Sequence, residues 1–423
     1  MNTAAPVTLV DPYSSGAGLA RALARAGYRV VAVLSEPLPA PVLRKTFRGG
    51  DFETVLGPVR DAGEVLADVA ALHPIAVLPG SECGVEVADV LASRLTPEWS
   101  NVPELSTARR HKGTMQRAVA ASGLPVLRTS TASDAGAARG WIDEHGLTGR
   151  DVVVKPALSA GTEDVTLLPA GAGLEQAFHR LIGRTNLLGV SNTDLVVQER
   201  AVGVEFVVDT FSDTNGHWLT SICRYHRTQT PEGFGRYESL EFVAYEPAEH
   251  GPLVGYVRKV LDALGIRFGY AHTEVMLTAD GPRLLEVGAR LGGAGLPAAA
   301  ALATGREPAS RLIAHLRHEP GAAGDFVLER PVLIAYFIAS RSGTISNVAA
   351  YRSISKLASC RYVNVNVNDG DHVNATTDLM STMGLGWAVF AHRDRSRLLE
   401  DRQAMRALEA AVRIDDIPVR VGS

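Results

Sequence analysis

The first hundred residues alternate short strand-like runs with helical patterns, and this alternation restricts the possible folds more than any other feature of the chain. The strand-like runs are rich in β-branched residues, and amphipathic stretches lie between them. In chain order the segments are 6–10, 17–26, 29–34, 61–71, 75–78 and 84–95. Strands that alternate with helices pair in parallel, because a helix returns the chain to the start of the next strand. The sequence therefore predicts a Rossmann-like, parallel α/β domain at the N-terminus.

The first turn of this domain, Asp11 to Gly18, is rich in small residues. It places backbone N–H groups at the start of a helix, where an anion can bind. However, the turn lacks the G-x-G-x-x-G spacing of dinucleotide-binding domains. An NAD-binding oxidoreductase is therefore a remote alternative, which tight NAD(H) binding without any effect of ATP would favour.

The rest of the 423-residue chain is expected to form further units, because the chain is too long for one typical hydrophobic core. A helix is expected over 102–122, and residues 123–125, Gly-Leu-Pro, end it. Between 151 and 287 the pattern changes to pairs of strands, which favours antiparallel sheets. After Arg330 strands alternate again, and a helix over 394–413 ends the chain. This last region is predicted to be a small α+β domain.

The expected architecture is a multidomain protein that combines α/β and α+β parts. The predicted parts are an N-terminal Rossmann-like domain over 1–105, a linking helical segment over 106–147, two further parts over 148–200 and 201–330, and a C-terminal α+β domain over 331–423.

Composition narrows the class of partner. The formal net charge of -4 gives no general attraction for nucleic acid or acidic membranes. The three cysteines lie far apart and form no C-x-x-C pair, so neither a disulfide framework nor a cysteine metal site is indicated. No apolar run approaches the roughly 20 residues that span a bilayer, and the N-terminus lacks the basic segment of a signal peptide. We therefore expect a cytoplasmic protein whose partners are small molecules.

Two glutamates on neighbouring strands form the strongest candidate site. Glu274 and Glu286 lie at nearly equal distances from the turn that begins at Ala279. If the strands pair as a hairpin about this turn, the two carboxylates come close across the ladder. Adjacent carboxylates repel each other unless a proton or a cation lies between them, and hard oxygen ligands favour Mg²⁺. A magnesium-phosphate site is the functional interpretation, and a solvated hairpin face is the alternative.

Lysine is rare in this chain, since only five of the 42 basic residues are lysines. Lys155 ends an apolar strand and precedes the small-residue loop Leu158 to Thr162. A lysine beside such a loop can bind phosphate while the N–H groups of the loop close over the polyphosphate. Lys112, on the preceding helix, can reach the same phosphates from the other side. No Walker loop is present.

Two further candidate features are a hinge from Glu199 to Glu205 and the glycine-rich turn after Arg290. Glu199 ends one strand and Glu205 begins the next, so the link Ala201-Val202 can offer backbone groups to an adenine. Arg290 precedes the glycine-rich segment 291–295. An arginine fork beside such a turn can hold a transferring phosphoryl group or an oxyanion, whereas a salt bridge to Glu286 is the structural alternative.

The order of these motifs resembles the ATP-grasp superfamily, and more narrowly its carboxylate-amine ligases of the L-amino acid ligase kind. The resemblance covers nearly the whole chain. It implies an ATP-grasp fold in which 148–200 is a mobile lid subdomain and 201–330 is the catalytic subdomain. Each motif is degenerate, whereas the ordered set is specific. The motifs are the small-residue N-terminal turn, the Lys-x-x-Met helix at Lys112, the strand and loop at Lys155, the hinge of Glu199 and Glu205, the His-x-Glu strand at His272 and the segment from Glu286 to Arg290.

The resemblance also implies a role for each matching residue. ATP would be bound at its phosphates by Lys112, Lys155, Ser159, Gly161 and Thr162, at adenine by Glu199 and Val202, and at ribose by Glu205. Mg²⁺, for which Mn²⁺ can substitute, would be held by Glu274 and Glu286, while Arg290 would stabilise the reacting groups with His272 near the substrate.

The chain departs from the family pattern at Gly288, where many ATP-grasp enzymes have asparagine. This departure leaves the number of magnesium ions open. For the substrate, Glu82 is expected to bind an amine, and Arg224 or Arg227 an α-carboxylate, with Gly293 offering a bare backbone N–H. A surface ion pair or a loop cap is an equal alternative for these charged residues. Family analogy also suggests a homodimer.

The predicted reaction is attack of a substrate carboxylate on the γ-phosphorus of ATP, followed by transfer of the acyl phosphate to an amine. The products would be ADP, phosphate and an amide or dipeptide of specialised metabolism. Alternatives within the superfamily are a cyclase, another amide-forming enzyme or a carboxylase, which bicarbonate-dependent ATP turnover without an amine would indicate. A nucleotide-binding regulatory protein that has lost catalysis is a third class.

Overall fold

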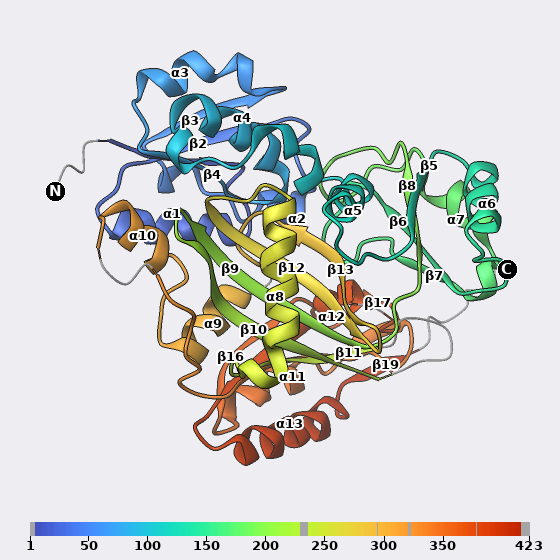
Figure 1. The fold of residues 1–423 in the computed structure, drawn as a ribbon. Helices are drawn as coiled ribbons and strands as arrows, with labels where there is room; N and C mark the ends of the chain where they lie inside the picture. Colours follow the sequence, from blue (N-terminus) through green and yellow to red (C-terminus); the bar gives the residue numbers. More distant parts are fainter. Residues whose placement is uncertain (1–4, 229–235, 294, 320–322, 378, 416–423) are drawn as a thin grey trace, which may run out of the picture. The chain divides into compact units, whose positions relative to one another are not determined.

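The computed structural model describes residues 5–228, 236–293, 295–319, 323–377 and 379–415. Its elements are labelled in Figure 1. The chain divides into two compact units, and each is described by itself. The first unit contains Met1–Ile222, Tyr245–Pro297 and Glu307–Phe326, and the second contains Cys223–Ala244, Ala298–Arg306 and Val327–Ser423.

The N-terminal part of the first unit is the predicted parallel α/β domain. Its sheet has the order β3-β2-β1-β4 with parallel neighbours, formed by β1 (Val7–Val10), β2 (Val30–Ser35), β3 (Thr54–Val59) and β4 (Ala76–Pro79). Helix α1 (Ser15–Arg25) packs its leucines on one face, and α3 (Leu66–Ala71) and α4 (Val85–Leu95) cover the other. The carboxyl end of β1 leads into the turn that contains Ser14, and that of β4 leads into the turn that contains Glu82.

Strand β3 was not expected from the sequence. It contains Gly57 and Pro58, which weaken a strand pattern because proline donates no ladder hydrogen bond. The strand lies at the edge of the sheet, where only one side pairs. An edge position tolerates proline, so the local pattern is a poor guide there.

The helix expected over 102–122 is broken into three pieces, so that prediction is wrong in its continuity. Two short 3-10 helices, Pro103–Leu105 and Thr107–Arg109, precede helix α5 (Lys112–Ala121). His111 has extended backbone angles, and its Nδ1 accepts the Thr114 N–H at 3.2 Å. This side-chain cap starts a new helix and places Lys112 at its first position.

The predicted lid segment, 148–200, lies in a four-stranded antiparallel sheet with two helices on one face, which also includes residues 129–144 of the predicted linking segment. This part is referred to below as the lid subdomain. Its strand order is β5-β8-β6-β7, formed by β5 (Thr129–Ala132), β8 (Leu195–Glu199), β6 (Val152–Pro156) and β7 (Thr166–Leu168). Helices α6 (Ala135–Glu144) and α7 (Leu174–Leu181) bury their apolar sides against Val152, Val154 and Val197. The alternation in β6 leaves Lys155 on the opposite face from this core.

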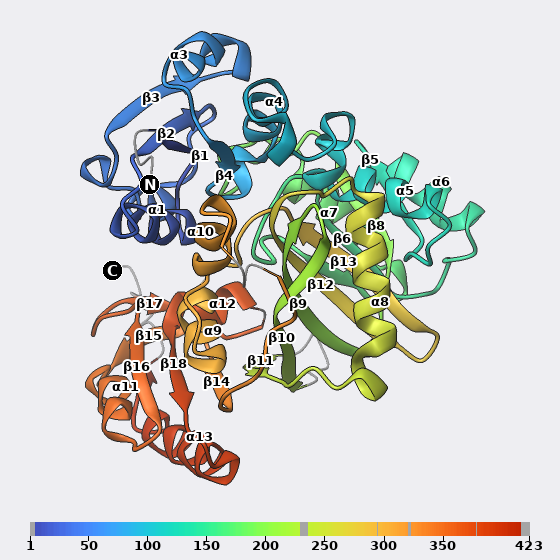
Figure 2. The same cartoon turned by 60° about the vertical axis from the view of Figure 1, so that its left-hand side comes forward.

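The remaining sheet of the first unit carries the acidic residues. Its strands have the order β13-β12-β9-β10, with β13 (Gly281–Gly288), β12 (Gly269–Thr278), β9 (Val204–Asp213) and the first part of β10 (Gly216–Thr228). Helix α8 (Pro247–Ala263) packs along β12 and β13 (Figure 2), and α10 (Ser310–Leu316) contributes to the core around Phe211. The antiparallel arrangement predicted for this region is confirmed.

The second unit contains the region after Arg330, which is α+β as predicted. It also includes Cys223–Ala244 and Ala298–Arg306, which the sequence analysis placed in the preceding part, 201–330. The end of β10 continues into the antiparallel order β10-β11-β14-β18-β16, with β11 (Arg236–Phe242), β14 (Val332–Tyr336), β18 (Gly386–Ala391) and β16 (Cys360–Val365). A second sheet contains β15 (Gly343–Ser346), β17 (His372–Val373) and β19 (Arg413–Asp415). The helices are α9 (Leu296–Thr304), which begins in the first unit, α11 (Ala349–Ser353), α12 (Leu379–Leu385) and α13 (Arg395–Glu409).

Across the described parts of both units, every helix is too short or too polar to cross a membrane.

Candidate active site

Glu274 and Glu286 lie directly opposite each other on β12 and β13, as the spacing about the turn predicted. The register shifts by one residue immediately after Glu274, so Leu285 is the extra residue of a bulge. Before the shift, Glu274 pairs with Glu286 and His272 pairs with Gly288. Directly opposed residues project to the same face of an antiparallel sheet. The two carboxylates therefore form the acidic pair that a divalent cation would require.

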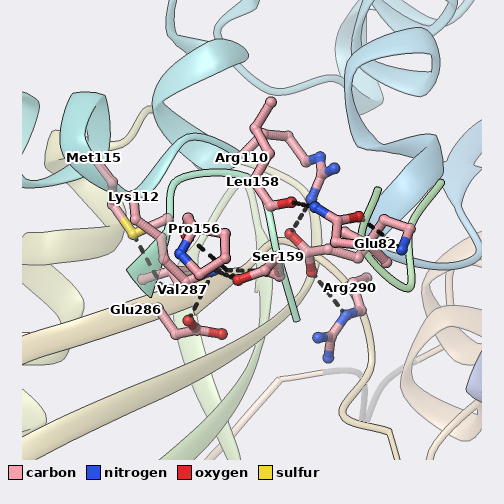
Figure 3. A network of polar contacts seen from close by, with 12 residues as sticks. Glu82, Arg110, Lys112, Met115, Pro156, Leu158, Ser159, Glu286, Val287 and Arg290 are labelled. Atoms are coloured by element: carbon pink, nitrogen blue, oxygen red, sulfur yellow. Dashed lines mark hydrogen bonds and ion pairs between the residues drawn. The ribbon is translucent and has the colours of Figure 1, made fainter. Parts of the chain in front are cut away.

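Lys112 lies between this acidic pair and the small-residue loop. Its buried ammonium is 3.1 Å from Glu286 Oε2 and donates to the backbone carbonyl of Ser159 at 2.5 Å (Figure 3). Met115, one turn later on α5, accepts the Val287 N–H through its sulfur at 3.2 Å. The Lys-x-x-Met helix is thus attached to β13 and holds the lysine in place.

Lys155 projects from β6 into the same buried region. Burial lowers its pKa to about 8, and the negative charge of Glu286 partly opposes this effect. Burial alone would raise the pKa of Glu286, but the positive charges of Lys112 and Lys155 bring it below its ordinary value. Two ammonium groups and a carboxylate therefore share one region of low dielectric, where added phosphate charges would interact strongly.

The loop after β6 has the backbone of an anion-binding turn. Gly161 and Thr162 have positive φ angles of 69° and 62°, and Asp164 follows with 58°. The Thr162 hydroxyl is buried and has no hydrogen-bond partner within the described ranges. A buried hydroxyl without a partner costs free energy unless a ligand or water bonds it. Successive N–H groups in such a turn, with this hydroxyl, fit phosphate oxygens.

The hinge residues occupy three different environments. The Glu199 carboxylate accepts the Arg128 backbone N–H at 2.8 Å and the Arg128 guanidinium at 2.7 Å, so this side chain fixes the strand end. Val202 is 70% exposed, whereas Glu205 is buried at the start of β9. Val202, an exposed apolar residue between Glu199 and Glu205, is available to contact a planar ring such as an adenine.

His272 is held by two neighbouring strands. Its Nδ1 lies 2.7 Å from Asp209 Oδ1, and the Ser221 hydroxyl donates to Asp209 Oδ2 at 2.8 Å. Its Nε2 lies 3.5 Å from Glu274. Burial alone would lower the pKa of His272, but Asp209 raises it to about 9. At neutral pH His272 is therefore a cation and cannot accept a proton as a general base.

Arg290 pairs with Glu82 and not with Glu286, so the salt bridge considered as a structural alternative does not form. Arg290 Nε donates to Glu82 Oε2 at 3.0 Å, and the second oxygen of Glu82 accepts from Arg110 at 2.9 Å. Figure 3 shows Glu82 between the two arginines. Arg110 is a site residue that the sequence reasoning missed, although it lies two positions before Lys112.

Gly288, the departure from the family pattern, lies directly beneath this pair. A Cβ atom at position 288 would be 2.9 Å from Glu82 Oε2 and 3.2 Å from Arg290 Nη2. Both distances are shorter than ordinary van der Waals contact, so a side chain at this position would displace the ion pair. The glycine therefore makes room for the contact between Glu82 and Arg290.

The chain is similar to known proteins over nearly its whole length. Dapdiamide A synthase of Enterobacter agglomerans is 29% identical over 431 residues, which cover 97% of each chain. The crystal structure of L-amino acid ligase from Bacillus licheniformis has a TM-score of 0.71 at 18% identity and covers 98% of this chain and 99% of that one. The ADP complex of N5-carboxyaminoimidazole ribonucleotide synthetase has a TM-score of 0.66 at 14% identity, covering 96% and 97%. No family model matches the chain.

This chain has the ATP-grasp fold. It resembles the carboxylate-amine ligases that form amide bonds, in agreement with the expectation from its motifs.

The fold brings most of the predicted site residues into one unit. The nucleotide, metal and catalytic candidates, together with Glu82 and Gly293, all belong to the first compact unit. Arg224 and Arg227 lie on the part of β10 that belongs to the second unit. Arg224 is exposed opposite Glu241, and the Arg227 guanidinium lies 5.2 Å from the ring centroid of Tyr237. Their expected role as carboxylate ligands stays a prediction.

The acidic pair of Glu274 and Glu286 fits Mg²⁺ better than a metal that needs a full protein shell. Within the described ranges, no group of three or more histidine, cysteine, aspartate or glutamate residues could hold a metal ion. Mg²⁺ commonly takes one or two carboxylates and completes its shell with water and substrate phosphates. Glu274 and Glu286 supply that donor set beside the lysines. A zinc-type centre is not indicated by these residues.

Proposed function

We propose that this protein uses ATP and Mg²⁺ to activate a substrate carboxylate as an acyl phosphate and then joins it to an amine. The observation that supports this most directly is the convergence of Lys112, Lys155, Glu274, Glu286 and Arg290 in one compact unit. Such a cluster combines cations for phosphates with carboxylates for a metal. Mn²⁺ is expected to replace Mg²⁺, since both favour carboxylate oxygen ligands.

The residues of the nucleotide subsite would act mainly by position and charge. Lys112 and Lys155 would bind the phosphates of ATP, and the loop from Ser159 to Thr162 would close over them. Val202 and Glu199 would contact adenine at the hinge, and Glu205 would accept from ribose. Mg²⁺ held by Glu274 and Glu286 would neutralise charge on the transferring phosphoryl group. These residues would leave the γ-phosphorus open to the substrate carboxylate.

Arg290 would act on the groups that form after phosphoryl transfer. Its guanidinium can bind the acyl phosphate and then the oxyanion that develops when an amine attacks. His272, as a cation beside Glu274, adds positive charge at the same side of the sheet. Exclusion of water by the lid would protect the acyl phosphate from hydrolysis until the amine arrives.

Amino acids or amino-acid-like molecules are the proposed substrates. Support comes from the similarity to Dapdiamide A synthase and from the fold shared with an L-amino acid ligase. Glu82 remains the proposed ligand of an amine. Arg224 or Arg227, and separately Gly293, remain the proposed ligands of a carboxylate. Light scattering in solution would test the proposed homodimer.

The decisive experiment measures phosphate release from MgATP with the purified protein against a matrix of amino acids, singly and in pairs, with mass spectrometry of the products. Release that requires a pair, with a product mass equal to the two amino acids minus water, is expected. Turnover driven by bicarbonate without any amine would instead identify a carboxylase. ATP binding without turnover across the matrix would contradict the proposal for these substrates.

A further inference from the structure

Two consecutive arginines in the segment before α5 have different surroundings. Arg109 is fully buried, and each of its three guanidinium nitrogens has a hydrogen-bond partner. Its Nε and Nη2 donate to Asp89 Oδ2 at 3.0 Å and 2.7 Å, while Nη1 and Nη2 donate to the carbonyls of Leu264 and Val102 at 2.8 Å each. Such a satisfied guanidinium ties segments together, which is a structural role.

Arg110 is nearly as buried but is not saturated. Only 5% of it is exposed, and its Nη1 donates to Glu82 Oε1 at 2.9 Å. Its Nε is buried and finds no hydrogen-bond partner in the described part of the chain. A buried cation with an unsatisfied donor does not favour stability. The side chain is therefore better explained by what it does to Glu82 than by a contribution to folding.

Glu82 is fixed from two sides. Arg110 holds one of its oxygens, and Arg290 Nε donates to the other at 3.0 Å. Arg290 Nη1 is bonded to the Leu291 carbonyl at 2.9 Å. Gly288 brings the backbone of β13 against the same oxygen of Glu82. Arg290 therefore uses Nε to bond Glu82 and Nη1 to bond the Leu291 carbonyl. Its third nitrogen, Nη2, takes part in neither of these two hydrogen bonds.

We propose that Arg110 is a positioning residue for Arg290, acting through Glu82. By holding one oxygen of Glu82, Arg110 prevents the carboxylate from forming a two-bond fork with Arg290, the geometry that arginine and carboxylate otherwise prefer. Arg290 Nη2 then stays available for the acyl phosphate. This inference rests on the proposed function, because it requires Arg290 to bind the reacting groups.

The test compares Arg110→Met with the wild type in amine-dependent phosphate release. The substitution keeps the length of the side chain and removes its charge. We expect kcat to fall by about 10-fold to 100-fold, as for other residues that orient a site residue. The dissociation constant of ATP should change by less than about twofold, because Arg110 has no contact with Lys112 or Lys155. Arg117→Met, an exposed arginine on α5, is the matched control and should keep full activity.

A double-variant cycle separates positioning from a structural role. In an Arg290→Ala background, Arg110→Met should cause no further loss, because its effect passes through Arg290. A loss that multiplies with that of Arg290→Ala would overturn the proposal, as would full activity of Arg110→Met. Arg110→Lys restores one donor to Glu82 and should recover part of kcat.

A second variant approaches the same contact from β13. Gly288→Ala introduces a Cβ 2.9 Å from Glu82 Oε2, and its backbone is not in the left-handed region. It should lower kcat with little change in ATP affinity, and it carries the test if Arg110→Met does not fold. Unchanged kcat in Gly288→Ala would count against the proposal. Full activity of Arg290→Ala would instead overturn the proposed function, whereas an inactive Arg290→Ala with a fully active Arg110→Met would overturn only this inference.

Discussion

At the scale of single residues, Glu286 connects the metal and phosphate parts of the site. It lies opposite Glu274 in the hairpin and forms an ion pair with Lys112, in which Lys112 Nζ is 3.1 Å from Glu286 Oε2. Glu286→Gln keeps the shape but removes the charge that would bind Mg²⁺. We expect phosphate release to fall at least about 100-fold, in line with the loss of a group that stabilises transferring charge. Stopped phosphate assays at saturating MgATP measure this.

Asp280→Asn is the control for this variant. Asp280 lies in the exposed turn of the same hairpin, and its backbone makes the turn hydrogen bonds. It should retain wild-type turnover. Circular dichroism and melting temperature must show that Glu286→Gln is folded, and a folded variant with full activity would refute the metal assignment.

Asp11 gives a prediction about pH. It is fully buried at the end of β1 and accepts the Ser35 N–H at 2.9 Å, while burial raises its pKa from 3.8 to about 6. The native state therefore binds a proton more tightly than the unfolded state. Stability falls as pH rises from about 4 to 6 and then stays level, and the charged carboxylate costs about 3 kcal/mol at pH 7 from this shift.

The variant Asp11→Asn tests whether the charged carboxylate of Asp11 lowers the stability at high pH. In the wild type the Ser35 hydroxyl also donates to the second carboxylate oxygen of Asp11. The uncharged amide of asparagine can accept the Ser35 N–H and donate to the Ser35 hydroxyl oxygen, and asparagine tolerates the positive φ of 49° at this position. The variant should melt at a higher temperature than the wild type at pH 8, and the difference should shrink below pH 5. A difference that does not change with pH would show that the charge of Asp11 is not the cause.

At the scale of elements, one loop of the lid subdomain is attached to the N-terminal domain. The Leu187 carbonyl accepts the Ala40 N–H at 2.8 Å, and Asn186 donates to the Leu158 carbonyl at 2.7 Å. Gly189 lies against the chain here, since a Cβ at this position would be 2.3 Å from the Leu38 carbonyl. The same loop therefore contacts both the N-terminal domain and the start of the phosphate loop.

Gly189→Ala should break this attachment. The added methyl group clashes with the Leu38 backbone, and the φ of 80° is unfavourable for alanine. We expect a higher KM for ATP and faster proteolysis within the lid. Gly183→Ala has the same kind of backbone, with φ of 75°, but open space around its Cβ. If both variants behave alike, backbone strain and not the contact with Leu38 is responsible.

At the scale of the whole molecule, ligand binding should raise the free energy of unfolding. A ligand that binds only the native state adds about 2.7 kcal/mol at 100 times its dissociation constant. The melting temperature should therefore rise with MgATP concentration, and EDTA should remove much of the rise because the phosphates and the acidic pair then repel each other. NAD(H) should have no effect. Stabilisation by NAD(H) and none by ATP would favour the oxidoreductase alternative.

Local sequence determined the features that depend on neighbours in the chain. The near-equal spacing of Glu274 and Glu286 about one turn predicted that they lie close across the hairpin, because a hairpin aligns residues by distance from its turn. Their direct pairing also depends on the bulge at Leu285, since a regular ladder would place Glu274 opposite Leu285. The alternation of strands and helices likewise predicted the parallel domain. Apolar periodicity gave the wrong local structure at two places. It did not predict the edge strand β3, which contains a proline, and it predicted one continuous helix where the side chain of His111 caps the start of α5.

Only the tertiary structure decided the contacts among residues that are remote in sequence. Glu82, Arg110 and Arg290 come from three separate segments, and no spacing rule relates them. The reason for Gly288 likewise appears only once Glu82 lies against it. The charge of His272 depends on Asp209 from another strand. Periodicity predicts which face a residue takes within its own element, but the partner it meets there depends on how the elements pack.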